Sequence, residues 1–215
     1  MYKFSTSLMD ELPEFAPKAL EVLRQPLEDR IVTISRASGT LTFPANFLLV
    51  GAMNPCPCGY HMDTMRTCTC SPTTIARYQA RISGPLLDRI DLHVEVPRVE
   101  YDKLLSQERA EPSQIIRERV IAARERQAAR FSSRPGLHAN ADMSAGDISS
   151  FCTLTTSARQ LIDLSVRRMQ LSARAYHRVL KLSRTIADLD ASDHIDAHHV
   201  AEAVQYRAKL MSTAS

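Results

Sequence analysis

The sequence lacks long apolar runs, and it lacks a strong excess of charge of either sign. No stretch reaches the ~18 apolar residues that a membrane-spanning helix needs. The 27 Lys and Arg and the 24 Asp and Glu leave a formal net charge of +3, so we expect neither a membrane span nor a polyelectrolyte. The opening residues, MYKFSTSLMDEL, have a single Lys and no apolar signal-peptide core, so we expect a cytoplasmic protein.

Cysteine is scarce over most of the chain. The 215 residues contain five cysteines, and four of them lie between Cys56 and Cys70. Such a cluster is a poor disulfide framework, and in a reducing compartment it indicates either a metal site or inert buried thiols. Cys152 stands apart in a helical context, where we expect a small core residue.

The first half of the chain has the texture of an α/β fold. Its strand-like runs, punctuated by Pro and Gly, are 31–35, 40–43, 47–53 and 92–96. Helical length and composition mark 15–27 and 74–82. The first two strand-like runs flank Ala37-Ser38-Gly39, which predicts a hairpin. The run FLLVGAM has no polar alternation, which predicts a strand buried on both faces of a parallel sheet.

The second half of the chain is predicted to be helical, because Pro and Gly become rare after Ser113. Helical spacing marks three segments, 113–131, 172–189 and 196–210. We expect 132–146 to be a loop between helices. The change in texture places the boundary within 97–112 and predicts two domains, residues 1–100 and 101–215.

An acidic pair, Asp10 and Glu11, follows Leu8 and Met9 directly. At the end of a buried strand such a pair suits nucleotide hydrolysis, because one carboxylate can hold hydrated Mg²⁺ while the other polarises an attacking water. The alternative is a helix N-terminus, where the same two side chains serve as a cap and as partners of the helix dipole.

Two further polar residues stand beside predicted strands. Asn54 follows FLLVGAM, and residues just past the carboxyl ends of parallel strands line the ligand crevice of open α/β sheets. Its alternative role is to cap the turn into Pro55. Arg89, in SGPLLDRID, has the forked charge that suits a phosphate clamp. Its alternative is a local ion pair with Asp88 or Asp91.

The clustered thiols form two C-x-C pairs, Cys56 with Cys58 and Cys68 with Cys70. Four thiolates so close in sequence can close a tetrahedron around Zn²⁺, and the Gly and polar residues between the pairs allow the loop to fold back. The spacing is tighter than that of the usual C-x-x-C knuckle. Reduced thiols packed in a loop are therefore the alternative to a structural zinc site.

Basic residues recur on two of the predicted helices. One broad face of 172–189 carries Arg174, His177, Arg178, Lys181 and Arg184. A face of this kind contacts phosphate or nucleic acid, or is simply solvated. The helix 113–131 also carries several arginines, Arg130 among them, but glutamates interrupt them, which predicts a solvated surface.

Five strings stand in this order along the chain: LMDELPEF, LEVLRQPLED, FLLVGAMNPCPCGY, RISGPLLDRIDLHVEVP and LSARAYHRVLKLSRTIADL. Together they resemble the magnesium-chelatase-like AAA+ ATPases of the ComM/YifB family, over residues 8–210. The resemblance implies a partial AAA+ parallel-sheet core with a β-hairpin insertion, followed by an all-α lid domain.

The same resemblance implies a role for each candidate residue. Asp10 and Glu11 are the Walker B pair, with Asp10 on the nucleotide-bound Mg²⁺ and Glu11 as the catalytic base. Asn54 is the sensor-1 residue, and Arg89 is the arginine finger that enters a neighbouring subunit's site. Arg174, in LSARAYHR, matches the nucleotide-binding sensor 2 of the lid. The hairpin is similar to the pre-sensor-1 hairpin that related helicases turn toward a central pore.

Two features depart from the family pattern. Only nine residues precede Asp10, and no G-x-x-x-x-G-K-[ST] phosphate-binding loop occurs in the sequence. The positions before the acidic pair, strongly apolar in the family, are here Ser5, Thr6 and Ser7. We therefore expect a C-terminal portion of such an ATPase, from a late start codon or a truncated gene, that does not hydrolyse ATP alone.

The function implied by the resemblance is that of a fragment of a ring-forming, ATP- and Mg²⁺-dependent motor that remodels DNA and is linked to natural transformation. The implied partners are like subunits, a hexamer when complete, and DNA. One alternative is the ATPase subunit of a magnesium chelatase. The other is a non-enzymatic truncated relic or binding module, which the missing phosphate-binding loop favours.

Overall fold

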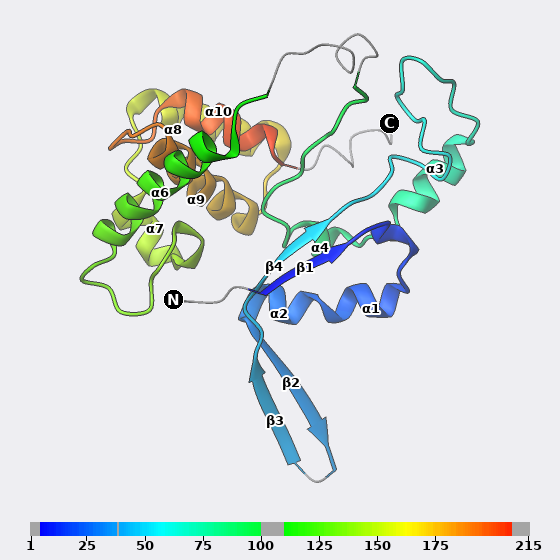
Figure 1. Cartoon of the computed structure of the whole chain (residues 1–215), viewed down its shortest axis with the longest axis horizontal. Helices are drawn as coiled ribbons and strands as arrows, with labels where there is room; N and C mark the ends of the chain where they lie inside the picture. The colour runs from blue at the N-terminus through cyan, green and yellow to red at the C-terminus, as the bar shows by residue number, and fades with distance from the viewer. Residues whose placement is uncertain (1–4, 38, 100–109, 208–215) are drawn as a thin grey trace. The chain divides into compact units, whose positions relative to one another are not determined.

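The computed structural model describes residues 5–37, 39–99 and 110–207 (Figure 1). The chain divides into two compact units, the first running to Ile90 and the second beginning at Asp91. Each unit has a hydrophobic core of its own. None of the described helices is long and apolar enough to cross a membrane.

The first unit mixes helices and strands, which confirms the predicted α/β class. Its elements in chain order are β1 (Ser5–Met9), the 3-10 helix η1 (Leu12–Glu14), α1 (Pro17–Val22), α2 (Arg24–Asp29), β2 (Ile31–Arg36), β3 (Gly39–Pro44), β4 (Phe47–Gly51), α3 (Pro72–Gln79) and α4 (Gly84–Leu87). The single helix predicted over 15–27 is two shorter helices that meet at Leu23. The break fits Pro26, because proline has no N–H to donate to the preceding turn.

Strands β1 and β4 form a parallel pair, in register from Ser5 opposite Phe47 to Met9 opposite Gly51. The expectation that the strand in FLLVGAM, which is β4, is buried on both faces is wrong for the described chain, because Leu48 is 56% exposed. The reason is that β4 pairs with β1 alone among the described strands, so the sheet has only two strands. A continuous apolar strand in a two-stranded sheet leaves part of its side chains uncovered.

Strands β2 and β3 form the predicted antiparallel hairpin, which projects as an arm from the first unit (Figure 1). Gly39 takes φ 141° at the turn, a conformation that other residues rarely adopt. One face carries hydroxyls, with Thr33 3.4 Å from Thr42 and Ser35 3.3 Å from Thr40. The other face is apolar and consists of Val32, Ile34, Leu41 and Phe43.

The core of the first unit is small and lies under the ends of the two parallel strands. Its buried side chains are Leu12, Leu20, Ile82, Leu86 and Leu87. Met9 and Met53 pack against this cluster from the ends of β1 and β4. The core therefore joins the turn after each parallel strand to helix α4. Met9, Leu12 and Met53, which adjoin the candidate residues Asp10, Glu11 and Asn54, all pack in this one group.

The second unit is helical over most of its length. Its elements in chain order are α6 (Ser113–Arg130), the 3-10 helix η2 (Asn140–Asp142), α7 (Ala145–Phe151), α8 (Thr156–Met169), α9 (Ala173–Leu189) and α10 (Ala197–Gln205). The three helices predicted from spacing are present as α6, α9 and α10. The segment 132–146 is not purely a loop, because it contains η2 and the first residues of α7, and helix α8 was not predicted.

The segment 92–96 is not a strand, contrary to the expectation from its apolar alternation. Its apolar side chains are solvated, since Val94 is 64% exposed and Val96 is 87% exposed. The backbone N–H of His93 donates to the carbonyl of Tyr206, just past α10, at 2.9 Å. Alternating apolar residues form a strand only beside a neighbouring strand, and none lies there in the described part of the second unit.

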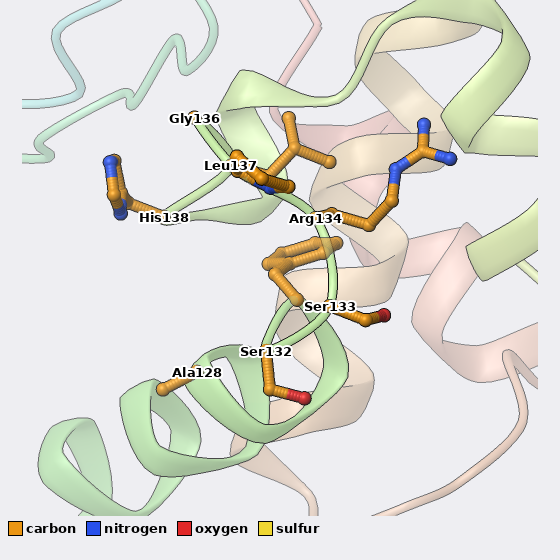
Figure 2. Close-up of a pocket in the computed structure, with 9 residues that line it drawn as sticks. Ala128, Ser132, Ser133, Arg134, Gly136, Leu137 and His138 are labelled. Carbon is orange, nitrogen blue, oxygen red and sulfur yellow. The ribbon is translucent and has the colours of Figure 1, made fainter.

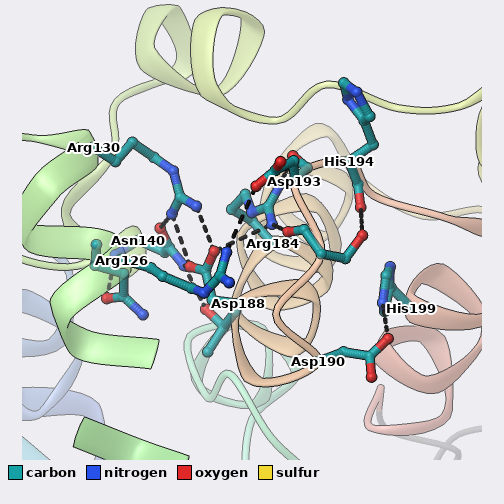
Figure 3. Close-up of polar contacts among 12 residues, drawn as sticks. Arg126, Arg130, Asn140, Arg184, Asp188, Asp190, Asp193, His194 and His199 are labelled. Atoms are coloured by element: carbon teal, nitrogen blue, oxygen red, sulfur yellow. Dashed lines mark hydrogen bonds and ion pairs between the residues drawn. The ribbon is translucent and has the colours of Figure 1, made fainter. Parts of the chain in front are cut away.

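Asp188 on α9 is the centre of a buried polar network in the second unit (Figure 3). Arg130 of α6 donates two hydrogen bonds to its carboxylate, one of them 2.8 Å long, and the Asn140 amide donates a third at 2.8 Å. Arg184, one turn earlier on α9, lies 3.2 Å from the same carboxylate. One carboxylate thus pairs with two arginines and connects η2 and α6 to α9.

This network corrects the expected basic faces of two helices. Arg184 is only 1% exposed, so it does not belong to a solvated or phosphate-contacting face of α9. Arg130 is 18% exposed and likewise does not belong to a solvated surface of α6. Arg184 also donates to the backbone carbonyls of Ser192 and Asp193, which fixes the turn that follows α9.

We predict that Asp188→Ala strongly destabilises the second unit. The change leaves two guanidinium groups in the interior without their carboxylate, and removing one partner of a buried ion pair costs about 3–5 kcal/mol. Urea unfolding followed by circular dichroism at 222 nm gives the measurement. Asp193→Ala is the matched control: its carboxylate is 91% exposed and 3.6 Å from Arg126, so the transition should not move. Equal transitions in the two variants would contradict the role given to Asp188.

Candidate functional site

The acidic pair of Asp10 and Glu11 follows directly after β1, and both residues are exposed. Glu11 adopts a left-handed backbone conformation, with φ 50°, which is uncommon for a residue other than glycine. The Asp10 carboxylate accepts the N–H of Glu11 at 2.9 Å. Glu11 occupies the N-cap position of η1, but its side chain makes no capping hydrogen bond. The Glu11 carboxylate is therefore not used as a helix cap.

Asn54 lies at the same edge of the parallel sheet as the acidic pair. The N–H of Ala52 donates to the carbonyl of Met9, and the N–H of Leu12 donates to the carbonyl of Ala52, each at 2.9 Å. These two hydrogen bonds tie the turn after β1 to the turn after β4. Asn54 is exposed two residues further along. The sheet thus brings an acidic pair and an amide to neighbouring carboxyl ends of strands, where open α/β sheets bind ligands.

Arg89 lies just past α4 and is held within the first unit. Its Nε lies 3.2 Å from a Glu28 carboxylate oxygen on α2, and its terminal nitrogen donates to the carbonyl of Pro85 at 2.6 Å. The side chain is only 13% exposed. The carboxylate partner is thus a residue distant in sequence, whereas Asp91, a neighbour along the chain, pairs with Arg178.

Glu21 is a second residue that sequence reasoning missed in the surroundings of Arg89. Ser83 caps the N-terminus of α4 by accepting the N–H of Leu86 at 3.3 Å, and its hydroxyl donates to Glu21. The Ser83 hydroxyl, followed by the paired Arg24 guanidinium, lowers the pKa of Glu21. Glu21 and Glu28 lie in α1 and α2, within the string LEVLRQPLED, whose acidic positions were the available signal.

Arg174 belongs to the second unit and is exposed in the first turn of α9. The helix begins at the predicted cap, because Ser172 accepts the N–H of Ala175 at 3.2 Å. An arginine beside the N-terminus of a 17-residue helix adds a fixed positive charge to the positive end of the helix dipole. This end of α9 is therefore electrostatically suited to an anion.

The four cysteines of the two C-x-C pairs form one compact cluster in the first unit. Their sulfur atoms all lie within 4.8 Å of one another. Cys56 Sγ lies 3.4 Å from Cys58 Sγ and 3.7 Å from Cys68 Sγ, and the Cys58 and Cys68 sulfurs are 3.5 Å apart. A disulfide needs about 2.05 Å, so the thiols are free. The folding back of the loop, expected from its composition, is present.

Backbone N–H groups point at these sulfurs. Those of Tyr60 and Thr69 donate to Cys58 and lower the pKa of its thiol to about 5. The N–H of Cys70 acts on Cys68 in the same direction, but burial and the neighbouring sulfurs outweigh it and raise the pKa of Cys68 to about 12. The N–H donors stabilise a thiolate at Cys58, and that negative charge in turn opposes ionisation of the neighbouring Cys68 thiol.

The geometry of the cluster fits a tetrahedral thiolate site. A tetrahedron with Zn–S bonds of about 2.3 Å has edges of about 3.8 Å. The observed sulfur separations of 3.4, 3.5 and 3.7 Å lie close to this edge length. Four soft ligands with N–H donors behind them provide both the ligand count and the outer hydrogen bonds of a structural metal site.

A second group with metal-ligating side chains, Asp190, His198 and His199, lies in the second unit. His199 is buried, and its Nδ1 accepts the N–H of Asp196 at 2.9 Å. A neutral imidazole that accepts at Nδ1 carries its proton at Nε2, which lies 3.2 Å from the Asp190 carboxylate. Nε2 therefore donates a hydrogen bond and has no lone pair available to bind a metal. The hydrogen bond from His199, and to a smaller extent that from His198, lowers the pKa of Asp190. The group connects the end of α9 to α10.

A cavity of about 410 Å³ lies in the second unit at the end of α6 (Figure 2). The turn that follows Phe131 forms most of its wall, and Gly136 takes φ 88° there. Arg134 lines the cavity, but its guanidinium pairs with the buried Asp147. None of the candidate site residues lines this cavity.

Two adjoining family models match the chain. The model of magnesium chelatase, subunit ChlI, matches residues 6–104, and the model of the C-terminal part of the same subunit matches residues 110–207. The matches thus cover both compact units.

Three curated relatives support the same assignment. Competence protein ComM of Haemophilus influenzae is 44% identical over 203 residues, which are 94% of this chain and 38% of the relative. The uncharacterized protein YifB of Escherichia coli is 42% identical over 93% of this chain and 38% of its own length. An uncharacterized protein of Mycobacterium tuberculosis is 36% identical over 93% of this chain and 39% of its own. The chain thus spans under two fifths of the curated relatives that it matches, and it belongs to the magnesium-chelatase-like family that includes ComM and YifB.

Proposed function

We propose that the chain supplies part of the ATP-hydrolysing centre of a ring-forming AAA+ motor that remodels DNA. The observation that carries the proposal is the position of the acidic pair and Asn54 just past two adjacent parallel strands, joined by the hydrogen bonds of Ala52. This edge of a parallel sheet is where phosphate chemistry is placed in such folds. Residues 1–100 are the core portion in this proposal, and residues 101–215 are the helical lid.

The proposed chemistry is divided among five residues. Asp10 would hold the Mg²⁺ of the nucleotide, and this ion would neutralise part of the phosphate charge. Glu11 accepts a proton from the attacking water, and Asn54 orients that water or the terminal phosphate. Arg89 stabilises transition-state charge in a neighbouring subunit's site. Arg174 connects the state of the nucleotide to the lid from the N-terminus of α9.

DNA and the ring are proposed from the family and from the relatives' names. One relative is named a competence protein, which supports a role in natural transformation. DNA branch migration is proposed from the family resemblance alone. Like subunits, six in a complete ring, are the proposed partners, because an arginine finger acts across a subunit boundary. The β2–β3 hairpin has the free, projecting form that a pore-facing element requires.

The alternative enzyme is the ATPase subunit of a magnesium chelatase, which inserts the metal into a porphyrin. The names of both family models favour it. The identities of 44% and 42% to ComM and YifB favour the DNA motor instead. A non-enzymatic binding module is the third candidate, and the missing G-x-x-x-x-G-K-[ST] string favours it. DNA-stimulated ATP hydrolysis separates the motor from both alternatives.

We predict that the 215-residue chain alone does not hydrolyse ATP, because its sequence has no phosphate-binding loop. Fusion to the part of Haemophilus influenzae ComM outside the match should create DNA-stimulated turnover. In that chimera Glu11→Gln should lower the rate about 10²- to 10⁴-fold, and Arg89→Ala about 10³- to 10⁵-fold with nucleotide binding retained. Phosphate release and fluorescent-nucleotide binding provide the two measurements.

The control for Arg89→Ala is Arg81→Ala, because Arg81 is also paired, 3.0 Å from Glu14, but is 40% exposed. It should keep full turnover. Mixing Glu11→Gln subunits with Arg89→Ala subunits should restore part of the activity, since some interfaces then combine an intact base with an intact finger. Turnover by the unfused chain that Glu11→Gln abolishes, or full activity of the Arg89→Ala chimera, would contradict the proposal.

We also infer that the four clustered cysteines hold one structural Zn²⁺. Sulfur separations close to a tetrahedral edge, N–H donors to the thiolates and complete burial of Cys56 support this inference. A closed shell of four thiolates leaves no position for a substrate water. The metal would order the loop 55–71 and would leave hydrolysis to the acidic pair.

We predict close to one Zn²⁺ per chain in protein purified without added metal, measured by elemental analysis. Cys56→Ser and Cys68→Ser should each lose most of the metal, because three thiolates do not close the shell. Cys152→Ser is the control, since this buried thiol lies in the second unit and should not affect the metal content. Zinc far below one equivalent, with all four thiols titratable in the folded chain, would show a metal-free loop instead.

A further inference from the structure

The four cysteines of the cluster differ in solvent exposure. Cys56 is completely buried, whereas Cys58, Cys68 and Cys70 are half-buried. Small polar oxidants react with thiolates that they can reach. Oxidation of the cluster should therefore begin at one of the three half-buried cysteines.

The chain path favours one pair of half-buried sulfurs for a disulfide. Cys58 and Cys68 have sulfurs 3.5 Å apart and lie on opposite sides of the loop, with nine residues between them. Cys56 and Cys58 are equally close, but only Pro57 separates them and Cys56 is buried. A short ring through proline resists the geometry that a disulfide requires. Cys58 and Cys68 need only a small movement.

The cluster is connected to the proposed hydrolysis site at both ends. Pro55, which follows Asn54 directly, accepts a hydrogen bond from the Gln79 side chain of α3 at 3.0 Å. Cys70 precedes Ser71, the N-cap of α3. The cluster therefore connects Pro55 to the start of α3, and Gln79 at the end of α3 holds the carbonyl of Pro55. An intact cluster thus fixes the segment that carries Asn54.

We propose that Cys58 and Cys68 form an oxidation site whose disulfide releases the metal and loosens the segment around Asn54. The inference rests on the proposed structural Zn²⁺, and the oxidant is a peroxide. The Cys58 thiolate attacks one peroxide oxygen, which gives a sulfenic acid and, after protonation, one water. The Cys68 thiolate then attacks the Cys58 sulfur, and the S–O bond breaks to release a second water after protonation. Two thiolates lose one electron each, and the peroxide gains both.

The metal leaves because the disulfide removes two of its four ligands. The remaining thiolates, Cys56 and Cys70, cannot close a tetrahedral shell. Reduction by a thiol returns both ligands, so the change is reversible. The hydrogen bonds of Ala52 at the strand ends do not involve the loop, and they should persist when the metal is lost.

The test uses the zinc-loaded chain treated with hydrogen peroxide at about one equivalent. A chromogenic chelator measures released zinc, and peptide mapping by mass spectrometry identifies the disulfide. We expect release of the bound zinc together with a Cys58–Cys68 disulfide, and a thiol reductant with added Zn²⁺ should restore the starting state. Amide exchange should accelerate at Gly59, whose N–H donates to the backbone carbonyl of Cys56 at 3.0 Å, and stay slow at Ala52.

Cys152→Ser is the matched control, because it removes the one cysteine outside the cluster, and it should leave zinc release unchanged. Zinc that stays bound after peroxide treatment would overturn the oxidation site and leave the structural metal intact. Zinc release with a disulfide between Cys56 and Cys58 would overturn the assignment of the pair. An untreated chain without zinc would overturn the metal site itself, and this inference with it.

Discussion

Two hydrogen bonds past the parallel strands, both made by Ala52, set the geometry on which the first unit's proposed chemistry depends. They fix the turn after β1 against the turn after β4, so that the left-handed bend at Glu11 and the exposed Asn54 are held at one edge of the sheet. The buried side chain of Leu12 packs in the core of the first unit and so supports the turn after β1. Backbone hydrogen bonds and the packed core thus position Asp10, Glu11 and Asn54 together.

A buried network of charged side chains connects the helices of the second unit. Asp188 lies beside two arginines next to the apolar core of this unit, and further polar side chains, such as Gln127 and His199, are also buried there. Such a network is expensive to bury and is weak support for stability by itself. Its strength here is geometric, because a carboxylate with three donors in fixed directions admits one arrangement of α6, η2 and α9.

Local signals in the sequence predicted local structure well. The turn around Gly39 predicted the hairpin, the caps predicted the start of α9, and the two C-x-C pairs predicted a compact thiol cluster. Predictions failed where a distant partner decides the outcome. The segment 92–96 alternates like a strand but has no strand beside it, and Arg184 has helical spacing with surface arginines but meets a buried carboxylate. The same limit hid Glu28, because no spacing rule connects it to Arg89.

The contact between Glu28 and Arg89 has a consequence for how neighbouring subunits would sense each other under the proposed function. A guanidinium that already has a carboxylate partner and is 13% exposed does not reach across a boundary without exchanging one anion for another. The exchange becomes favourable as the charge of the competing anion increases, so a triphosphate competes with Glu28 better than a diphosphate does. Arg89 would then pair with the neighbouring subunit's nucleotide before hydrolysis and with Glu28 after it. The partner of this one arginine would therefore depend on whether the neighbour holds a triphosphate or a diphosphate.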